Sequence, residues 1–418
     1  CTERGYAYDE AGRVTSVENT TTSGHQEFTY TYDANGNILS ENTTRYTYDA
    51  LNRLATWYNP TTDTTTTYSY DEVGNLLSVI EGTQTIKSFT YNAANQITNP
   101  GFSYDANGNM VSDDTYNYIY DSDNRLKQVI RKSDNHTIAS YEYDYLGRRI
   151  KTEEQEKTTF FHYDGTSYNV VAESDSSGTI TARYFYDDKG WLIAMKQNEN
   201  IYYYQYNAHG DVVSLTNSSG EIINTYTYDP WGKVLLADEQ VENPYRYAGY
   251  RYDEATRLYY LWHRYYNPEI ARFMTRDLYR GDLRQPQSIN PYAYCENNPV
   301  TRIDPLGLWY IDVNISVGYW GGITTGVMLS DRTGVHAYLG GGIITPGFST
   351  SVTWSPYEPA PGWNIGLQGQ ITLIAIGQVG YGFKKCGEST KPEFFMEVGR
   401  GASLPTLIGG SLTAYYVW

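Results

Sequence analysis

One short pattern recurs through the first 253 residues: an aromatic residue followed by Asp or Asn. Successive copies lie 13 to 24 residues apart. The thirteen copies are Tyr8-Asp9, Tyr32-Asp33, Tyr48-Asp49, Tyr70-Asp71, Tyr91-Asn92, Tyr104-Asp105, Tyr120-Asp121, Tyr143-Asp144, Tyr163-Asp164, Tyr186-Asp187, Tyr206-Asn207, Tyr228-Asp229 and Tyr252-Asp253. Such self-similarity indicates a repeat architecture, in which each unit is stable only beside its neighbours.

Each unit is predicted to be a β-hairpin. In TYTYDANGNILS (29–40) the Tyr-x-Tyr half alternates with period two, as a half-buried strand does. The Asp-x-x-Gly-Asn half has the residues that favour a turn. Because one hairpin is not stable alone, neighbouring hairpins must share a sheet that curls or spirals to cover its edges. The predicted fold class is therefore all-β.

The composition agrees with a β fold and restricts the partners. The chain has 418 residues, of which 45 are Tyr and only 11 are Phe, and Tyr favours strands. Its net charge of −17 argues against a nucleic acid or an anionic membrane as the main partner. The sparse set Cys1, Cys295 and Cys386 indicates neither a disulfide framework nor a metal cluster.

The composition changes abruptly at the bond between Leu308 and Trp309. Residues 1–308 carry 42 acidic and 26 basic side chains, whereas residues 309–418 carry 6 and 5. The last 110 residues also hold 20 of the 38 glycines. We predict a boundary between two different modules at this bond. The chain does not begin with Met, and it is expected to be a fragment of a longer protein.

A dense block of motifs lies just before this boundary. Its pieces, in order, are Arg246-Tyr247-Ala248-Gly249-Tyr250, Tyr252-Asp253, Leu258-Tyr259-Tyr260, Arg264-Tyr265-Tyr266-Asn267-Pro268, Arg272-Phe273, Arg276-Asp277, Asn290-Pro291-Tyr292-Ala293-Tyr294, Asn297-Asn298-Pro299 and Asp304-Pro305-Leu306-Gly307-Leu308. With the repeats, this block resembles the RHS-repeat or YD-repeat family and its RHS-associated core. The resemblance covers roughly residues 1–308.

The resemblance implies a fold and a domain organisation. Residues 1–242 would be YD-repeat hairpins spiralling into part of a hollow shell, as in Tc toxin C subunits and teneurins. Residues 243–308 would be the core that plugs the shell, and residues 309–418 a small, variable, Gly-rich β domain. In polymorphic toxins of this family the last domain is the effector.

The resemblance also implies self-cleavage after Leu308, before Trp309. The matching carboxylates are Asp277 and Asp304, and Arg276 is expected to keep one of them ionised. Two close carboxylates share a proton, so one activates water while the other protonates the leaving group. Two other interpretations stay open: Asp304 as an ordinary turn starter before Pro-x-Gly, and Arg276-Asp277 as a local ion pair.

One stretch of the core departs from the family pattern. Relatives of the Tc toxin C subunit carry an acidic residue just before the Asn of the Asn-x-Tyr motif, but here the sequence is Gln287-Ser288-Ile289-Asn290. Asp282 lies nearby in another register. The identity of the second carboxylate therefore stays open. The tripeptide Arg280-Gly281-Asp282 is interpreted as a chance match to an integrin motif.

Residues 309–418 alternate like strands and contain many glycines, which is typical of a small curved β domain. Their polar candidates are Asp312, Asp331, His336, Lys384, Lys385, Cys386, Glu393, Glu397 and Arg400. His336 and Cys386 form a possible base–nucleophile pair, but surface residues on a β domain are the simpler interpretation. Zinc spacings and phosphate loops are missing, so no cofactor and no metal are predicted.

The functional hypothesis is a secreted or surface-delivered polymorphic toxin whose shell encapsulates its effector. Its expected partners are the upstream shell and delivery region and an immunity protein; a membrane is considered for the tail only. One alternative is a cell-surface adhesion protein without enzymatic activity. Another is a membrane-active, pore-forming β tail, suggested by the Gly-rich alternation.

Overall fold

The computed structural model describes residues 4–22, 24–188, 190–277 and 287–308, together with the backbone of residues 3, 286, 311–312, 322–330, 334–342, 362–369 and 410–417. The chain divides into two compact units, Cys1–Ser316 and Val317–Trp418. Over the described residues the regular elements are β-strands and three 3-10 turns, η1 (Tyr247–Gly249), η2 (Pro286–Ile289) and η3 (Cys295–Asn297). The prediction of an all-β fold is confirmed.

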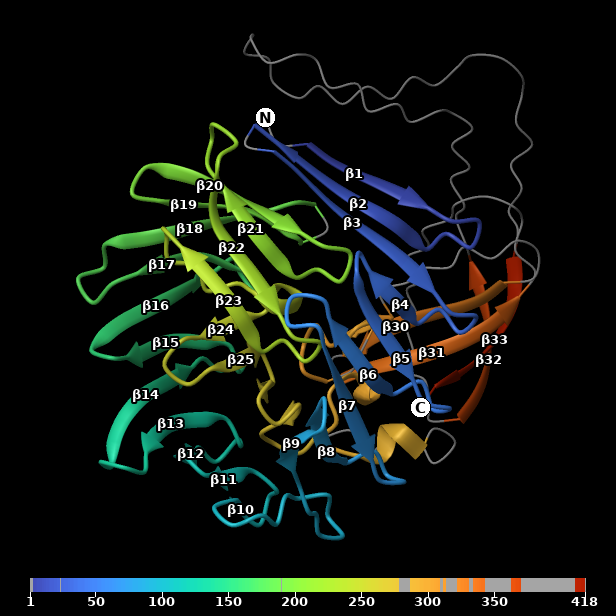
Figure 1. The fold of residues 1–418 in the computed structure, drawn as a ribbon, viewed down its shortest axis with the longest axis horizontal. Helices are drawn as coiled ribbons and strands as arrows, with labels where there is room; N and C mark the ends of the chain where they lie inside the picture. The colour runs from blue at the N-terminus through green and yellow to red at the C-terminus, as the bar shows by residue number, and fades with distance from the viewer. Residues whose placement is uncertain are drawn as a thin grey trace. The chain divides into compact units, whose positions relative to one another are not determined.

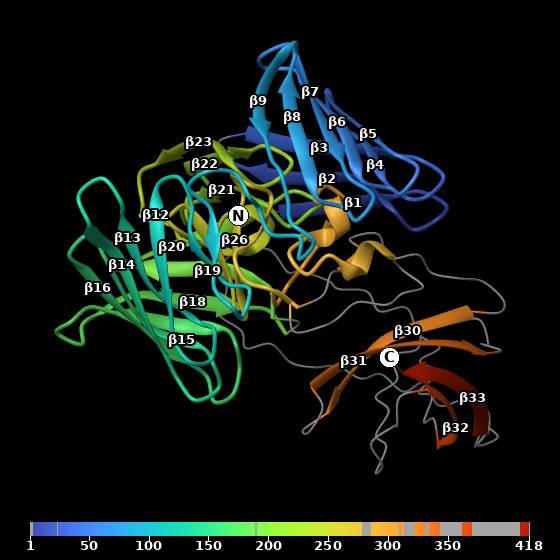
Figure 2. The same ribbon diagram turned by 90° about the horizontal axis from the view of Figure 1, so that it is seen from below.

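The repeats of the first unit form two antiparallel sheets in which every strand pairs with the next strand of the chain. The nine strands of one sheet are β1 (Glu3–Tyr8), β2 (Val14–Thr21), β3 (Gly24–Tyr32), β4 (Ile38–Glu41), β5 (Thr44–Tyr48), β6 (Leu54–Asn59), β7 (Thr64–Tyr70), β8 (Leu76–Glu81) and β9 (Gln84–Ser88). The fourteen strands of the other are β10 (Ser103–Tyr104), β11 (Met110–Ser112), β12 (Tyr116–Tyr120), β13 (Leu126–Arg131), β14 (His136–Tyr143), β15 (Arg149–Glu154), β16 (Lys157–Tyr163), β17 (Val170–Ser174), β18 (Ile180–Tyr186), β19 (Leu192–Gln197), β20 (Asn200–Tyr206), β21 (Val212–Thr216), β22 (Ile222–Tyr228) and β23 (Val234–Glu239). Figure 1 shows these strands following one another around the segment that carries β24 (Arg251–Asp253) and β25 (Leu258–Leu261), and Figure 2 shows the two sheets from below.

In ten of the thirteen repeats the tyrosine joins its hairpin to the one before it. Tyr70, the last residue of β7, donates its hydroxyl to the carbonyl of Leu54, the first residue of β6, at 2.8 Å. Ten such bonds, between 2.5 and 2.9 Å, join Tyr32 to Val14, Tyr48 to Ile38, Tyr70 to Leu54, Tyr91 to Leu76, Tyr120 to Met110, Tyr143 to Leu126, Tyr163 to Arg149, Tyr186 to Val170, Tyr206 to Leu192 and Tyr228 to Val212. A phenylalanine cannot make this bond, which explains the excess of Tyr over Phe.

The Asp or Asn after the repeat tyrosine closes the turn. In the turn 33–37 one oxygen of Asp33 accepts the amides of Asn35 and Asn37, and its other oxygen accepts the Asn37 side chain at 2.8 Å. Gly36 has φ +86°, a conformation that favours glycine. The predicted turn chemistry is therefore confirmed.

The segment 243–308 binds the row of repeat turns. Its own four-stranded sheet consists of β24 (Arg251–Asp253), β25 (Leu258–Leu261), β26 (Arg264–Asn267) and β27 (Arg272–Phe273). Asn298 donates to Asn37, Asn297 to the Gly74 carbonyl and Tyr292 to the Gly108 carbonyl, each at 2.8 Å. The core motifs thus dock on successive turns of the repeats.

A buried ion pair ties this core to the wall of the larger sheet. Arg149 of β15 donates two hydrogen bonds to the Asp253 carboxylate of β24, from Nη1 to Oδ2 at 2.5 Å and from Nη2 to Oδ1 at 2.9 Å. Neither side chain is more than 3% exposed. The rings of Tyr141, Tyr260 and Tyr265 surround the guanidinium. Both charges are therefore paired in a site that excludes water.

In the second unit the described backbone forms a four-stranded antiparallel sheet with the order β30-β31-β33-β32. Its strands are β30 (Gly322–Ser330), β31 (Gly334–Gly342), β32 (Gly362–Gly369) and β33 (Gly410–Val417). They lie within residues 309–418, the segment whose alternation predicts strands. The other predicted strands of the tail lie outside the described residues.

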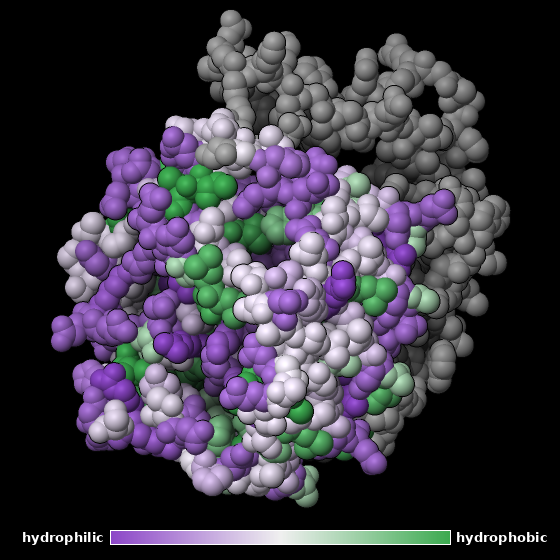
Figure 3. All heavy atoms as spheres, in the orientation of Figure 1, coloured by the Kyte–Doolittle hydropathy of each residue, from purple (hydrophilic) through white to green (hydrophobic). Residues whose placement is uncertain are grey.

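The described surface in Figure 3 is mostly hydrophilic, with small separate hydrophobic patches. Among the residues that the structure describes, no helix is long and apolar enough to cross a bilayer.

The tyrosine hydroxyls should contribute measurably to stability. Tyr70→Phe leaves the carbonyl of Leu54 without its donor while keeping the ring, so the free energy of unfolding should fall by about 1–2 kcal/mol. Tyr145→Phe is the matched control, because that side chain is 88% exposed. Urea unfolding of the full chain measures both, and equal midpoints for the two variants would contradict the role of the hydroxyl.

Stability should also depend on Glu154, at the end of β15. Burial and the nearby Asp253 carboxylate raise the pKa of Glu154 to about 8. In the folded state Glu154 keeps its proton up to about pH 8, whereas in the unfolded state it releases the proton near its ordinary pKa. The stability that protonated Glu154 contributes is therefore present in acid and is lost as the pH rises toward about 8.

We expect the free energy of unfolding of Glu154→Gln to rise by about 4 kcal/mol relative to wild type between about pH 5 and pH 9, measured by urea unfolding. Glu153→Gln is the control, because the Glu153 side chain is half exposed and Lys151 lowers its pKa. A constant difference between Glu154→Gln and wild type would show that the buried carboxyl does not titrate in this range.

Candidate functional site

The two predicted carboxylates, Asp277 and Asp304, both contact the guanidinium of Arg264. Nη2 of Arg264, on β26, is 2.8 Å from Oδ2 of Asp277 and 3.5 Å from Oδ2 of Asp304. The three side chains are 6%, 13% and 3% exposed. A single cation therefore holds both acids close together in a site largely closed to solvent.

Among the described residues, the positive partner of both acids is Arg264 and not the predicted Arg276. Arg264 also donates to the carbonyls of Gly307 and Pro291, and its Cζ lies 3.6 Å from the centre of the Phe273 ring. These contacts fix the guanidinium in one orientation. Arg276 is exposed, and its side chain lies beside Gly108. The RYYNP motif contains Arg264, but spacing alone does not reveal that it reaches across to Asp304.

Asp304 also starts a turn, as the simpler interpretation predicts. Its Oδ1 accepts the amides of Gly307 at 2.7 Å and Leu308 at 3.1 Å, and its own amide donates to the Tyr250 hydroxyl at 2.8 Å. The turn places the Gly307–Leu308 peptide against the carboxylate. Starting the turn and facing the second acid are thus compatible, since different oxygens make the two sets of contacts.

Gly307 is required by the geometry of this turn. Its φ is +73°, and a Cβ would lie 2.6 Å from the Leu261 carbonyl oxygen and 3.1 Å from the Arg264 amide nitrogen. A side chain would therefore push the turn away from β25 and β26. This explains the glycine in the Asp-Pro-Leu-Gly-Leu motif.

Several predicted residues lie outside the described part of the chain. Leu308 is described and half-buried, whereas Trp309 is not described. In the tail only the backbone of Asp312 and His336 is described, so the proposed pairing of His336 with Cys386 has no geometry to support it. The remaining candidates outside the described residues are Cys1, the 280–282 tripeptide, Asp331, Lys384, Lys385, Cys386, Glu393, Glu397 and Arg400.

Cys295, the one cysteine with a described side chain, is buried beside this site. Burial, and next the carboxylate of Asp304, raise the pKa of its thiol well above the ordinary value. A protonated, enclosed thiol is a poor nucleophile. Groups of three or more His, Cys, Asp or Glu suited to a metal do not occur among the described residues.

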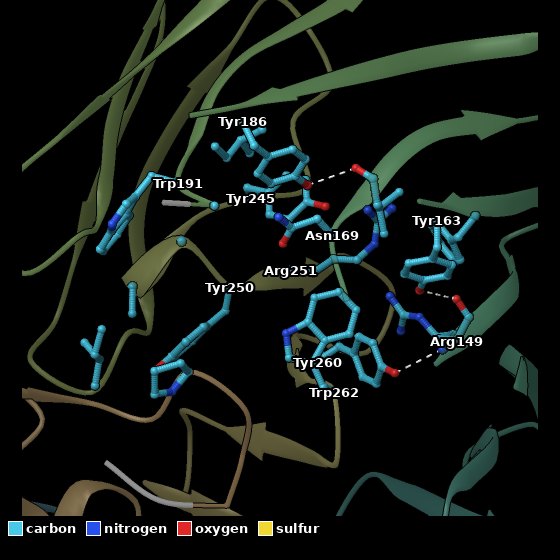
Figure 4. A pocket seen from close by; sticks show the side chains of 18 of the residues that line it. Arg149, Tyr163, Asn169, Tyr186, Trp191, Tyr245, Tyr250, Arg251, Tyr260 and Trp262 are labelled. Atoms are coloured by element: carbon cyan, nitrogen blue, oxygen red, sulfur yellow. Dashed lines mark hydrogen bonds between the residues drawn. The ribbon is translucent and has the colours of Figure 1, made fainter. Parts of the chain in front are cut away.

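A cavity of about 260 Å³ borders the residues on either side of Asp304. Ile303 and Pro305 contribute to its wall, and Figure 4 shows the rings that line the rest, including those of Trp191, Tyr245 and Trp262. Its two arginines are each paired with an acid: Arg149 with Asp253, and Arg251 with Glu173 at 2.7 Å. The wall is therefore aromatic and balanced in charge.

Two family models match the sequence of this chain. The model of the RHS repeat matches residues 8–47, and the model of the teneurin YD-shell matches residues 39–300, more than half of the chain. The chain belongs to the teneurin YD-shell family. The YD-repeat interpretation drawn from the tyrosine repeats and the core motifs is confirmed.

Relatives of this YD-shell protein include bacterial toxins. It is 37% identical over 238 residues to the tRNA nuclease WapA of Bacillus subtilis, a match covering 56% of this chain and 10% of WapA. It is 24% identical over 360 residues to the toxin protein Tse5 of Pseudomonas aeruginosa, covering 73% and 27%. The chain thus spans about a tenth to a quarter of the length of these relatives.

A solved structure shares the fold. The complex TcdB2-TccC3-Cdc42 matches with a TM-score of 0.61 at 22% identity, over 73% of this chain and 18% of the other. At this level of identity the likeness establishes a common shell architecture only.

The shape of the Asp304 turn should depend on Gly307. Gly307→Ala places a methyl group against the Leu261 carbonyl, so the turn should lose its bonds to Asp304. Hydrogen exchange of the amides of residues 307 and 308 should accelerate about tenfold or more. Gly36→Ala is the control, because its Cβ would meet nothing within 4 Å although φ is also positive. Unchanged exchange in Gly307→Ala would contradict the steric argument.

Proposed function

We propose that this chain is the C-terminal part of an RHS-repeat polymorphic toxin, in which the YD-shell encloses a C-terminal effector and releases it by aspartyl self-cleavage after Leu308. The observation that supports this most directly is the pair Asp277 and Asp304 on Arg264, beside the Gly307–Leu308 peptide. The abrupt change of composition at the Leu308–Trp309 bond supports a separate effector domain after it.

The proposed chemistry is hydrolysis of the Leu308–Trp309 amide without a cofactor. One carboxylate takes a proton from water while the water oxygen bonds to the Leu308 carbonyl carbon. The other carboxyl, protonated, gives its proton to the leaving nitrogen. The products are the carboxyl of Leu308 and the amine of Trp309. Arg264 stabilises the carboxylate that is ionised and orients Gly307 through its carbonyl.

The domain organisation follows from this hypothesis. Residues 1–242 form the repeat wall, 243–308 the core and 309–418 the effector. The WapA and Tse5 relatives support a toxin, and by analogy the partners are an upstream shell and delivery region and an immunity protein, with secretion or surface display and use in bacterial competition. Under this hypothesis the effector activity resides in residues 309–418 and not in the shell.

Scission should be visible as two masses. Strand β28 (Arg302–Ile303) pairs with β29 (Ile311–Asp312) across the proposed cleavage point, so the pieces should stay together under native conditions. Intact mass measurement in denaturant is therefore needed. We expect two species that separate at Leu308–Trp309.

Asp277→Asn and Asp304→Asn should each slow scission by about 100-fold or more. Asn at 304 still accepts the amides of Gly307 and Leu308, so this variant removes the acid and keeps the turn. Asp123→Asn is the control, since Asp123 is an exposed acid of a repeat turn. Unchanged scission in both variants would overturn the aspartyl mechanism. If the wild type instead shows only the mass of the intact 418-residue chain, the alternative of an uncleaved adhesion protein is favoured.

A further inference from the structure

A buried histidine joins the repeat wall to the segment that carries Asp304. His209 lies in the turn between β20 and β21 and is 6% exposed. Its Nδ1 is 2.8 Å from Oδ1 of Asp211, and its Nε2 is 3.1 Å from the carbonyl oxygen of Arg302. Arg302 precedes Asp304 by two residues.

Both partners of the ring only accept hydrogen bonds. A backbone carbonyl has no proton to donate. The Asp211 carboxylate already accepts the amide of Ala248 and the side chain of Asn207, each at 2.8 Å, as an ionised group does. Both ring nitrogens of His209 must therefore donate, which only the imidazolium form can do.

The charges around the ring favour this form. Burial alone would lower the pKa of His209, but the Asp211 carboxylate and the Arg302 carbonyl raise it above the ordinary value. Glu41, from β4, faces the same site and accepts the Asn207 side chain and the hydroxyl of Tyr30.

The other groups near the His209 ring do not reverse the preference for its protonated form. Burial and then Asp211 raise the pKa of Glu41 to about 7. The guanidinium of Arg302 pairs with Glu296 at 2.7 Å, and the Tyr247 ring lies 5.2 Å from the imidazole. Arg4 donates to the carbonyls of Tyr206 and Asn207 in the same turn, each at 3.1 Å. The acids Asp211 and Glu41 face the imidazole directly, whereas Arg302 is paired with Glu296.

We propose that His209 is a positioning residue for self-cleavage, whose doubly protonated ring holds the Arg302–Asp304 segment in register with Arg264 and Asp277. This rests on the proposed function. When the ring loses a proton, either Asp211 or the Arg302 carbonyl loses its donor. The segment then loosens, and the two carboxylates no longer meet reliably on Arg264. Scission acquires a dependence on pH that belongs to the repeat wall and not to the acids themselves.

The pH profile of scission tests this role. Full-length chain made by cell-free synthesis, collected in denaturant and diluted into buffers between about pH 6 and pH 9, is followed by intact mass. At neutral pH, scission of His209→Gln should be slower than that of wild type by about tenfold or more. Its rate should also lack the fall that wild type shows as pH rises and His209 loses its proton. Glu41→Gln should move that step to lower pH, because an anion beside the imidazolium is gone. His136→Gln, an exposed histidine of β14, should match wild type.

A second measurement does not depend on scission. In the Asp277→Asn background, ¹⁵N-histidine NMR should show both nitrogens of His209 protonated at neutral pH, with assignment by the His209→Gln spectrum. Hydrogen exchange of the amides of 302–308 should accelerate in His209→Gln and not in His136→Gln. A neutral ring at pH 7, or unchanged exchange, overturns the inference. If instead both readouts hold but Asp277→Asn and Asp304→Asn still cut, the aspartyl mechanism fails while the positioning contact stands.

Discussion

The shell depends on the bond from a repeat tyrosine to the carbonyl of the first residue in the second strand of the preceding hairpin. It occurs ten times and always joins one hairpin to the previous one. Each ring packs inward while its hydroxyl satisfies a polar group that would otherwise be buried alone. A wall with so many polar atoms on its inner side is stable in part because the repeat tyrosines supply donors for these ten carbonyls.

The same turns that end the hairpins form the docking surface for the core. Asn290, Asn297 and Asn298 bond to groups of the turns 71–75 and 33–37, and Tyr292 bonds to the turn 105–109. The core is therefore oriented by the repeats it contacts. Arg264, Asp277 and Asp304 come from separate parts of that core and meet only because its motifs are held in this way.

The sequence predicted the two acids of the candidate site but not the contacts that bring them together. Asp277 and Asp304 were recognisable from motifs, and the turn at Asp304 from its Pro-Leu-Gly continuation. Arg264 and His209 were missed as members, since their partners lie 13 and 40 residues away for Arg264 and 93 residues away for His209. Motif spacing carries no information about contacts at such separations; only the packing of the core against the wall creates them.

What the sequence determined by itself was local: strand alternation, turn chemistry, the period of the hairpins and the change of character after Leu308. These follow from residue types a few positions apart, where backbone sterics and short-range hydrogen bonds decide the outcome. The tertiary structure decided which charges meet. A guanidinium between two carboxylates and an imidazolium between two acceptors are stable only where burial removes water and several distant segments converge to pair each charge.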